Sequence, residues 1–159
     1  MIRSFAAALA LSLAAFAASA QTTPATNYTD MWWNSSESGW GVSFMQHSAT
    51  NQVFAVWYTY DPREAQAGGQ FKPLWIVMSG GTWTSPTTIS GPVYVTNGVP
   101  FNQAGGKTAQ SQVGTFTFSF SSASTGTFTY NIAGSGSGTD PGAGLPAFSG
   151  TKSITRQSF

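Results

Sequence analysis

The sequence contains no cysteine, a single histidine and few charged side chains. Without cysteine, the fold cannot be held by disulfides, and no thiolate can bind a metal. One histidine and a few dispersed carboxylates also supply too few ligands for a zinc or iron site. We therefore expect neither a metal nor another cofactor, and a domain stabilised by an ordinary hydrophobic core.

The sequence also lacks any run or stripe of basic residues. Six basic and five acidic residues give a net charge of +1, and one of the basic residues, Arg3, lies in the amino-terminal segment discussed next. Nucleic acids and anionic membrane surfaces are bound through basic patches. We therefore expect no nucleic-acid partner and no electrostatic binding to membranes.

No hydrophobic run is long enough to span a membrane comfortably. The longest one, residues 5–18, follows Arg3 and ends in small residues before Gln21. A transmembrane helix needs about 20 apolar residues, whereas this shorter pattern is typical of a secretory signal peptide with cleavage after Ala20. We expect residues 1–20 to be removed, the mature protein to be periplasmic or secreted, and no integral membrane insertion.

The remainder of the sequence predicts one domain of β-structure. Residues 21–27 contain turn formers without a hydrophobic period and are predicted to be a flexible lead-in, so the domain covers residues 28–159. Aromatic and β-branched residues alternate with small polar ones, and no segment has a helical period. Residues 52–61 and 71–81 are apolar at nearly every position, which predicts strands whose outer faces are also covered or only lightly polar.

The clearest alternation lies in residues 115–132. Aromatic side chains recur at every second position, change to Ser and Gly around residues 121–126, and then resume. This pattern predicts a hairpin with its aromatic side chains on one face. Those side chains are Phe116, Phe118, Phe120, Phe128 and Tyr130.

About eight antiparallel strands joined mostly by short turns are predicted in total, with no helix to cover a sheet. Closing such a sheet on itself removes its edges. The predicted fold is therefore all-β: an antiparallel up-and-down meander closing into a roughly eight-stranded barrel, with a two-sheet β-sandwich as the alternative. Such a barrel is either filled by side chains or holds one small ligand. Two glycine-rich stretches, residues 97–112 and 134–150, are predicted to be loops at the barrel ends.

The stretch MWWNSSESGWG, residues 31–41, contains three tryptophans. Neighbouring side chains of a strand point to opposite faces, so one of Trp32 and Trp33 faces the core and the other faces solvent. Indoles stack on the C–H faces of sugars while amides and carboxylates bond to hydroxyls, which favours a ligand site at one rim of the barrel. Packing that plugs the barrel end is the alternative. The predicted ligand-binding residues are Trp32, Trp33, Asn34, Glu37, Trp40, Trp57, Tyr58 and Trp75.

The sequence contains no motif that identifies a catalytic centre. There is no nucleophile elbow around a serine. Asp30 and Glu37 are the pair of carboxylates considered for glycoside hydrolysis, which requires that they lie about 5 to 9.5 Å apart. We assign no catalytic residue. The favoured function is an exported barrel that binds a small apolar or carbohydrate ligand. The alternatives are a structural or protein-interaction module of the cell envelope without a small ligand and, less favoured, a carboxylate-based hydrolase.

The opening motif D-x-WWN-x-x-ESGWG, residues 30–41, is followed by VFAVWYTYD, PLWIVMSGG, GPVYV and a terminal SITRQSF. Together these segments resemble a group of uncharacterised exported proteobacterial domains, with Ser35 standing at the position of a proline in that group. The resemblance implies an exported domain and carries over no catalytic residue. The meander is also similar in architecture to avidin and lipocalin barrels, which bind small molecules, but this analogy concerns the fold alone.

Overall fold

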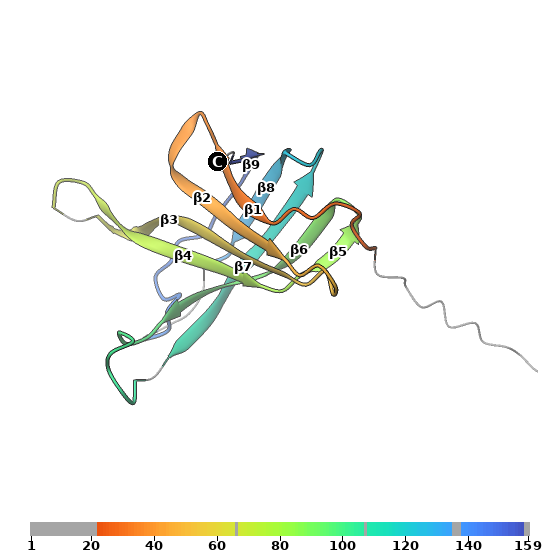
Figure 1. Cartoon of the computed structure of the whole chain (residues 1–159). Helices are drawn as coiled ribbons and strands as arrows, with labels where there is room; N and C mark the ends of the chain where they lie inside the picture. Colours follow the sequence, from red (N-terminus) through yellow and green to blue (C-terminus); the bar gives the residue numbers. More distant parts are fainter. Residues whose placement is uncertain (1–21, 66, 107, 135–137, 158–159) are drawn as a thin grey trace, which may run out of the picture.

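The computed structural model describes residues 22–65, 67–106, 108–134 and 138–157, so the predicted signal peptide, residues 1–20, lies outside the described residues. Within these ranges the chain forms strands and turns, and it contains no helix that is long and apolar enough to cross a membrane. The strands are β1 (Asp30–Asn34), β2 (Glu37–Gln46), β3 (Val53–Ala65), β4 (Phe71–Ser79), β5 (Thr82–Ser85), β6 (Thr88–Asn97), β7 (Ala109–Phe120), β8 (Thr125–Ile132) and β9 (Phe148–Arg156) (Figure 1).

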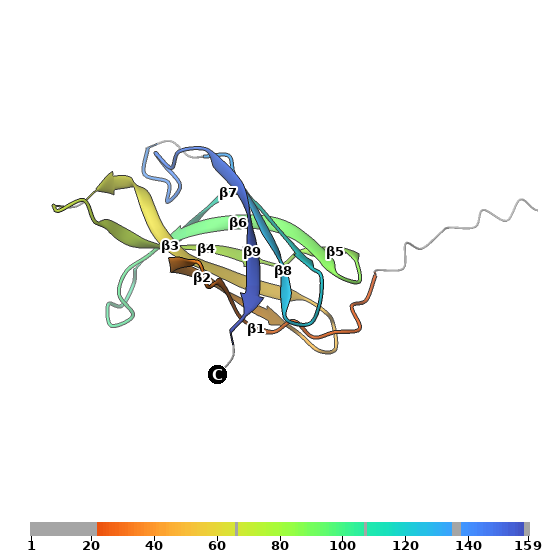
Figure 2. The same cartoon turned by 90° about the horizontal axis from the view of Figure 1, so that it is seen from above.

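Eight of these strands close into an antiparallel barrel. The order along the sheet is β4-β3-β2-β1-β9-β8-β7-β6, and β4 pairs with β6 at Val77 and Tyr94 to complete the circle (Figure 2). The predicted up-and-down barrel is therefore confirmed, and the sandwich alternative is wrong. The short strand β5, which the sequence did not predict, follows β4 and pairs with the same edge of β6, and its Trp83 is buried in the core.

A close backbone approach accompanies the passage from β4 to β5 along β6. A Cβ atom placed on Gly91 of β6 would lie 2.4 Å from the carbonyl oxygen of Gly80 and 2.9 Å from Cα of Gly81. Only glycine fits such a contact. Gly91 therefore allows the link after β4 to pass closely over β6.

The barrel interior is filled by aromatic side chains. Strands β7 and β8 pair with Phe118 opposite Phe128 and Phe116 opposite Tyr130, which confirms the predicted hairpin and its shared aromatic face. Phe128 is fully buried and its ring lies 4.9 to 6.2 Å, between centroids, from five other rings. Those rings belong to Trp40, Trp57, Phe116, Phe118 and Tyr130. Because side chains occupy this space, a ligand has to bind at an end or on the outer wall.

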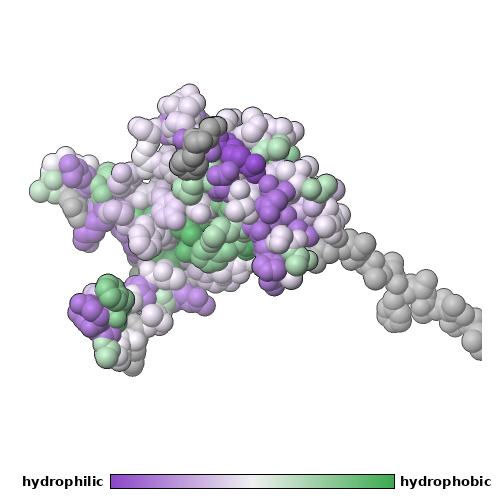
Figure 3. Space-filling model, in the orientation of Figure 1, coloured by the Kyte–Doolittle hydropathy of each residue, from purple (hydrophilic) through white to green (hydrophobic). Residues whose placement is uncertain are grey.

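The outer wall has two contrasting halves. On β7, β8 and β9 the outward positions are mostly threonine and serine, such as Thr117, Thr129 and Ser153. Figure 3 shows hydrophobic residues gathered on the face that carries β2 to β4. The outward positions of β1 to β4 include large apolar and aromatic side chains with exposed fractions between 36% and 64%. These side chains are Met31, Trp33, Met45, Phe54, Tyr58, Tyr60 and Trp75. The expectation that the outer faces of the apolar strands are covered or lightly polar is therefore wrong.

The seam between β4 and β6 opens toward one end of the barrel. Val77 and Tyr94 form the only registered pair between these strands, and beyond it β4 continues with β3 and β6 with β7 as two separate projecting hairpins (Figure 1). The free edge of β4 contains Lys72 and Pro73. The charge of Lys72 and the missing backbone N–H of Pro73 both disfavour pairing of this exposed edge with a strand of another chain.

Candidate functional site

Trp32 and Trp33 point to opposite sides of the barrel wall, as predicted. Trp32 is completely buried, and its Nε1–H donates to the carbonyl oxygen of Tyr28 at 2.9 Å. Trp33 is 37% exposed on the outer wall. Trp32 is therefore part of the core, and only Trp33 of this pair can meet a ligand on the surface.

Glu37 and Trp40 come together next to the β1–β2 turn. Nε1–H of Trp40 donates to Oε2 of Glu37 at 3.1 Å, and Nζ of Lys152 lies 2.8 Å from the same oxygen. The hydrogen bonds from Lys152 and then from Trp40 lower the pKa of the Glu37 carboxyl. Oδ1 of Asn34 accepts a hydrogen bond from the backbone N–H of Ser36 at 2.9 Å, and this bond stabilises the turn. Lys152, which the sequence did not single out, thus completes a cluster whose polar groups already have partners.

Trp57 lies in the interior at the same end of the barrel. It is buried among the rings of Phe116, Phe128, Tyr130 and Phe148, and its Nε1–H has no hydrogen-bond partner. An unpaired buried donor of this kind costs about 1–3 kcal/mol. Trp57 is therefore a core residue with a polar group left unsatisfied.

Arg63 joins β3 to the segment that precedes β9. Its Nη1 donates to the carbonyl oxygens of Pro141 at 2.7 Å and Ala143 at 3.2 Å, while its guanidinium forms a bidentate pair with Asp61. The hydrogen bond from Arg63 lowers the pKa of Asp61. Leu145 of the same segment is buried as part of the core cluster. The Arg63 contacts hold residues 138–147 against the barrel.

The two carboxylates considered for hydrolysis are not brought together. Asp30 is opposite Phe44 at one end of β1, whereas Glu37 is opposite Asn34 at the other end. Four residues of extended strand span about 13 Å, beyond the separation that glycoside hydrolysis uses. Asp30 is paired instead with Arg156 at 3.5 Å. Within the described part of the chain, no three His, Cys, Asp or Glu side chains are grouped to hold a metal.

Tyr58 and Trp75 meet on the outer wall at the open seam. They are direct cross-strand neighbours, with ring centroids 6.4 Å apart and planes at 77°. Trp75 is 64% exposed, the largest exposure of any tryptophan in the described chain. Its ring lines the seam groove, a hollow of about 890 Å³ between β4 and the β6–β7 loop.

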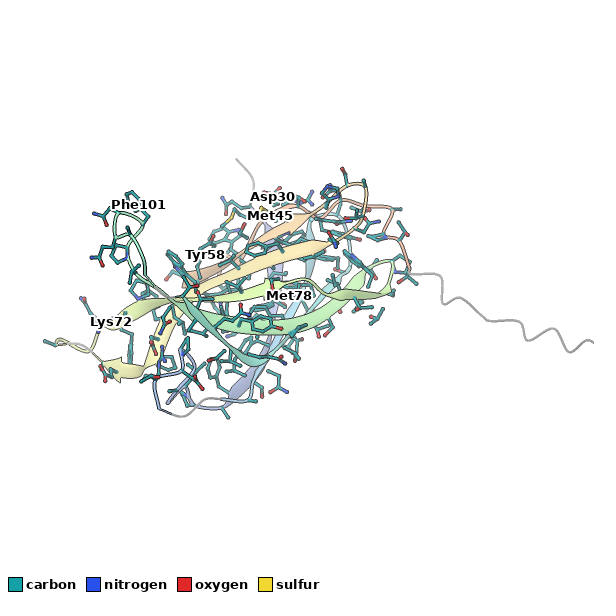
Figure 4. The ribbon with its side chains drawn as sticks, turned by 90° about the horizontal axis from the view of Figure 1, so that it is seen from below. Asp30, Met45, Tyr58, Lys72, Met78 and Phe101 are labelled. Carbon is teal, nitrogen blue, oxygen red and sulfur yellow. The ribbon has the colours of Figure 1, made fainter. Side chains whose placement is uncertain are left out.

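Uncharged side chains form the other described walls of the seam groove. Thr96 and Asn97 come from the end of β6, Val99 and Pro100 from the loop, and Gln110 from the start of β7. Figure 4 shows Tyr58 on the outer wall and Phe101 at the tip of this loop, with Lys72 across the opening on the β3–β4 hairpin. Hydroxyl and amide groups therefore face an indole across open space.

A second hollow lies on the other side of Trp75. It has a volume of about 490 Å³ and shares Trp75, Thr96 and Asn97 with the seam groove. Its remaining walls include Asp61, Arg63, Lys72 and Asp140. The seam groove on one side of the Trp75 indole is therefore lined by uncharged groups, whereas the second hollow on its other side is lined in part by charged ones.

The eight predicted site residues do not gather at one rim. Trp32 lies in the core, and Trp57 is buried inside one end of the barrel. Glu37 and Trp40 are partly exposed at that end, beside the turn that contains Asn34. Trp33, Tyr58 and Trp75 lie on the outer wall. The sequence did not single out Thr96, Asn97 or Gln110, because they lie at or near the ends of strands beside a predicted loop. The signal that could have found the groove is the run FKPLWIVMS, in which Trp75 alternates with buried residues and so must face outward.

No family model, curated protein or solved structure matches the chain. The resemblance of the opening motif to exported proteobacterial domains therefore stays a prediction.

Proposed function

We propose that the protein is an exported binding barrel that holds an uncharged carbohydrate in the seam groove. The observation that carries the proposal is the 64% exposed indole of Trp75 in a groove whose described walls are otherwise hydroxyl, amide and small apolar groups. A sugar ring stacks its C–H face on an indole and bonds its hydroxyls to such groups. Asn97 and Gln110 supply the amides, and Thr96 supplies a hydroxyl.

A carbohydrate fits this groove better than an apolar ligand. An apolar ligand is bound best in a concave site that buries most of its surface, whereas the barrel interior is filled by aromatic rings and the seam groove is open on the surface. The described lining includes no carboxylate, histidine or lysine. These side chains can bind and orient a sugar, but they supply no acid, base or nucleophile, so the proposal is binding without turnover.

The test compares binding of a panel of uncharged oligosaccharides by the mature protein and two variants, using titration calorimetry. Trp75→Ala removes the stacking surface and is expected to weaken binding about tenfold or more. Phe54→Ala is the matched control, because Phe54 is another exposed ring on β3 and lies outside the groove. Equal binding by Trp75→Ala and Phe54→Ala, or no binding of any saccharide by the wild type, would contradict the proposal.

A structural or protein-interaction module is the second candidate. Met31, Met45 and Phe54 favour it, since they add exposed apolar surface to the same wall outside the seam groove. Exposed apolar patches of this kind mark protein interaction sites. If the protein is an interaction module, Phe54→Lys is expected to abolish capture of an envelope protein. If the protein binds carbohydrate in the seam groove, the same variant is expected to bind carbohydrate like the wild type.

A further inference from the structure

Three exposed aromatic side chains lie in one row across strands β1 to β4. Tyr58 pairs with Trp75 on one side and with Gly41 on the other. Gly41 adjoins Val42, the partner of Trp32, and Trp33 follows Trp32 on β1 at the point where the β1–β2 register shifts. All three rings lie on the outer wall and are 37% to 64% exposed. We call Trp33, Tyr58 and Trp75 the aromatic row.

Gly41 leaves a gap in the aromatic row. Strands lie about 4.8 Å apart, so the positions of Trp33 and Tyr58, with β2 between them, are separated by about 10 Å. Because Gly41 has no side chain, nothing rises from β2 between the two rings, and the floor between them is flat backbone.

The outer wall next to the aromatic row is uncharged, and the charged side chains near Trp75 line the second hollow on the other side of its ring. The outward neighbours along the same strands are Ser43, Val56 and Val77. An uncharged face matches an uncharged partner, because a charged one would lose hydration here without gaining an ion pair. The row also continues directly into the seam groove, since Trp75 belongs to both.

We infer that the protein binds a linear, uncharged oligosaccharide laid across β1 to β4, with one end stacked on Trp75 in the seam groove and the chain continuing past Tyr58 and over Gly41 to Trp33. This inference rests on the proposed function and adds the class and length of its ligand. The sugars that cross β2 lie over Gly41, and a path across four neighbouring strands fits an extended chain better than a branched or helical one.

The experiment measures affinity against chain length. The mature protein is titrated with cello-oligosaccharides, and separately with chito-oligosaccharides, from the dimer to the hexamer. The wild type is expected to bind the hexamer more tightly than the dimer, by roughly threefold to tenfold for each extra sugar ring that contacts an aromatic side chain of the row. Trp33→Ala is expected to abolish the gain in affinity that comes from the sugar ring contacting Trp33, and to leave the affinity for the disaccharide unchanged.

Gly41→Leu is the decisive variant. A Cβ at Gly41 would lie 3.5 Å from the nearest atom, the carbonyl oxygen of Trp32, and this is an ordinary contact, so the substitution fits the fold. The leucine then projects into the gap in the aromatic row and blocks the path of the chain. Hexamer affinity is expected to fall to the level of the dimer, while dimer affinity stays at the wild-type value.

The outcomes separate the inference from the proposed function. If the dimer binds at Trp75 and the hexamer binds no more tightly, the inference is overturned and the proposed function stands. The same conclusion follows if Gly41→Leu changes dimer and hexamer affinities equally. If sedimentation shows a dimer that Gly41→Leu dissociates, the row is a contact between two copies of the chain and the inference is overturned. If no saccharide of any length binds, both the inference and the proposed function are overturned.

Discussion

Trp75 meets Tyr58 edge to face across strands β3 and β4, with the ring centroids 6.4 Å apart. Aromatic pairs prefer this geometry, and it contributes about 0.5–1.5 kcal/mol beyond the buried area. The contact fixes the direction in which the indole stands on an otherwise open wall. Tyr58 therefore orients the binding surface as well as forming part of it.

Tyr58 is expected to act through its ring, not its hydroxyl. No hydrogen bond of the Tyr58 hydroxyl occurs among the described contacts, whereas the ring supports Trp75. Tyr58→Phe is thus expected to bind oligosaccharides like the wild type, and Tyr58→Ala to lose about tenfold in affinity. Calorimetric titration of both variants checks this, and a large loss in Tyr58→Phe would show that a ligand bonds to the hydroxyl.

A matched pair of tryptophans tests the role of buried indole hydrogen bonds. Trp32 donates its Nε1–H to Tyr28, whereas the Nε1–H of Trp57 has no partner. Both substitutions to phenylalanine remove a similar volume from the core. Trp32→Phe additionally leaves a buried carbonyl unsatisfied, while Trp57→Phe removes an unsatisfied donor.

We therefore expect Trp32→Phe to lower the free energy of unfolding by at least about 1 kcal/mol more than Trp57→Phe. Urea unfolding followed by circular dichroism measures both values, and the slope of the transition checks that each variant still unfolds in two states. Equal losses would mean that the Trp57 donor has a partner in solution, such as a bound water.

Asp61 gives the protein a defined sensitivity to acid. Hydrogen bonding to Arg63 lowers the pKa of Asp61 in the folded state below its ordinary value near 4. The folded state therefore holds this proton less tightly than the unfolded state does. The stability that Asp61 contributes is fully present above about pH 4 and is lost as the pH falls through the lower, folded pKa.

Asp61→Asn tests this effect. At neutral pH the variant is expected to unfold at a lower urea concentration than the wild type, and the difference is expected to shrink as the pH falls below about 4. Glu37, whose pKa is also lowered, is present in both proteins and cancels in the difference. A difference that is constant from neutral to acid pH would show that the Asp61–Arg63 pair contributes no linked stability.

Much of the fold could be predicted because the side-chain period of two is explicit in the sequence. Phe116, Phe118 and Phe120 alternate with hydroxyl residues, and this alternation alone indicated the buried face of β7. Strand β5 was missed because its four residues, Thr82–Ser85, are too short to show a period and lie between glycine and proline. Its pairing depends on the close approach at Gly91, which is a tertiary contact.

The location of the candidate site was less predictable. The cluster of three tryptophans near the start of the mature chain predicted a ligand site at one rim of the barrel. Strand alternation instead places Trp32 and Trp33 on opposite faces of the wall, and the side chains of Trp40 and Trp57 point toward the barrel interior. Trp75 faces an open groove because β4 and β6 diverge beyond Val77 and Tyr94. That divergence is a property of how the barrel closes, and no local pattern in the sequence encodes it.

The most direct test of the central claim uses the six tryptophan indoles as reporters. Their Nε1–H groups give separate signals in a proton–nitrogen correlation spectrum of the mature protein labelled with nitrogen-15. On addition of an uncharged oligosaccharide, the account predicts that the Trp75 signal shifts while those of the buried Trp32 and Trp83 stay in place. A shift confined to buried indoles, or an unmoved Trp75 signal at saturating saccharide, would contradict it.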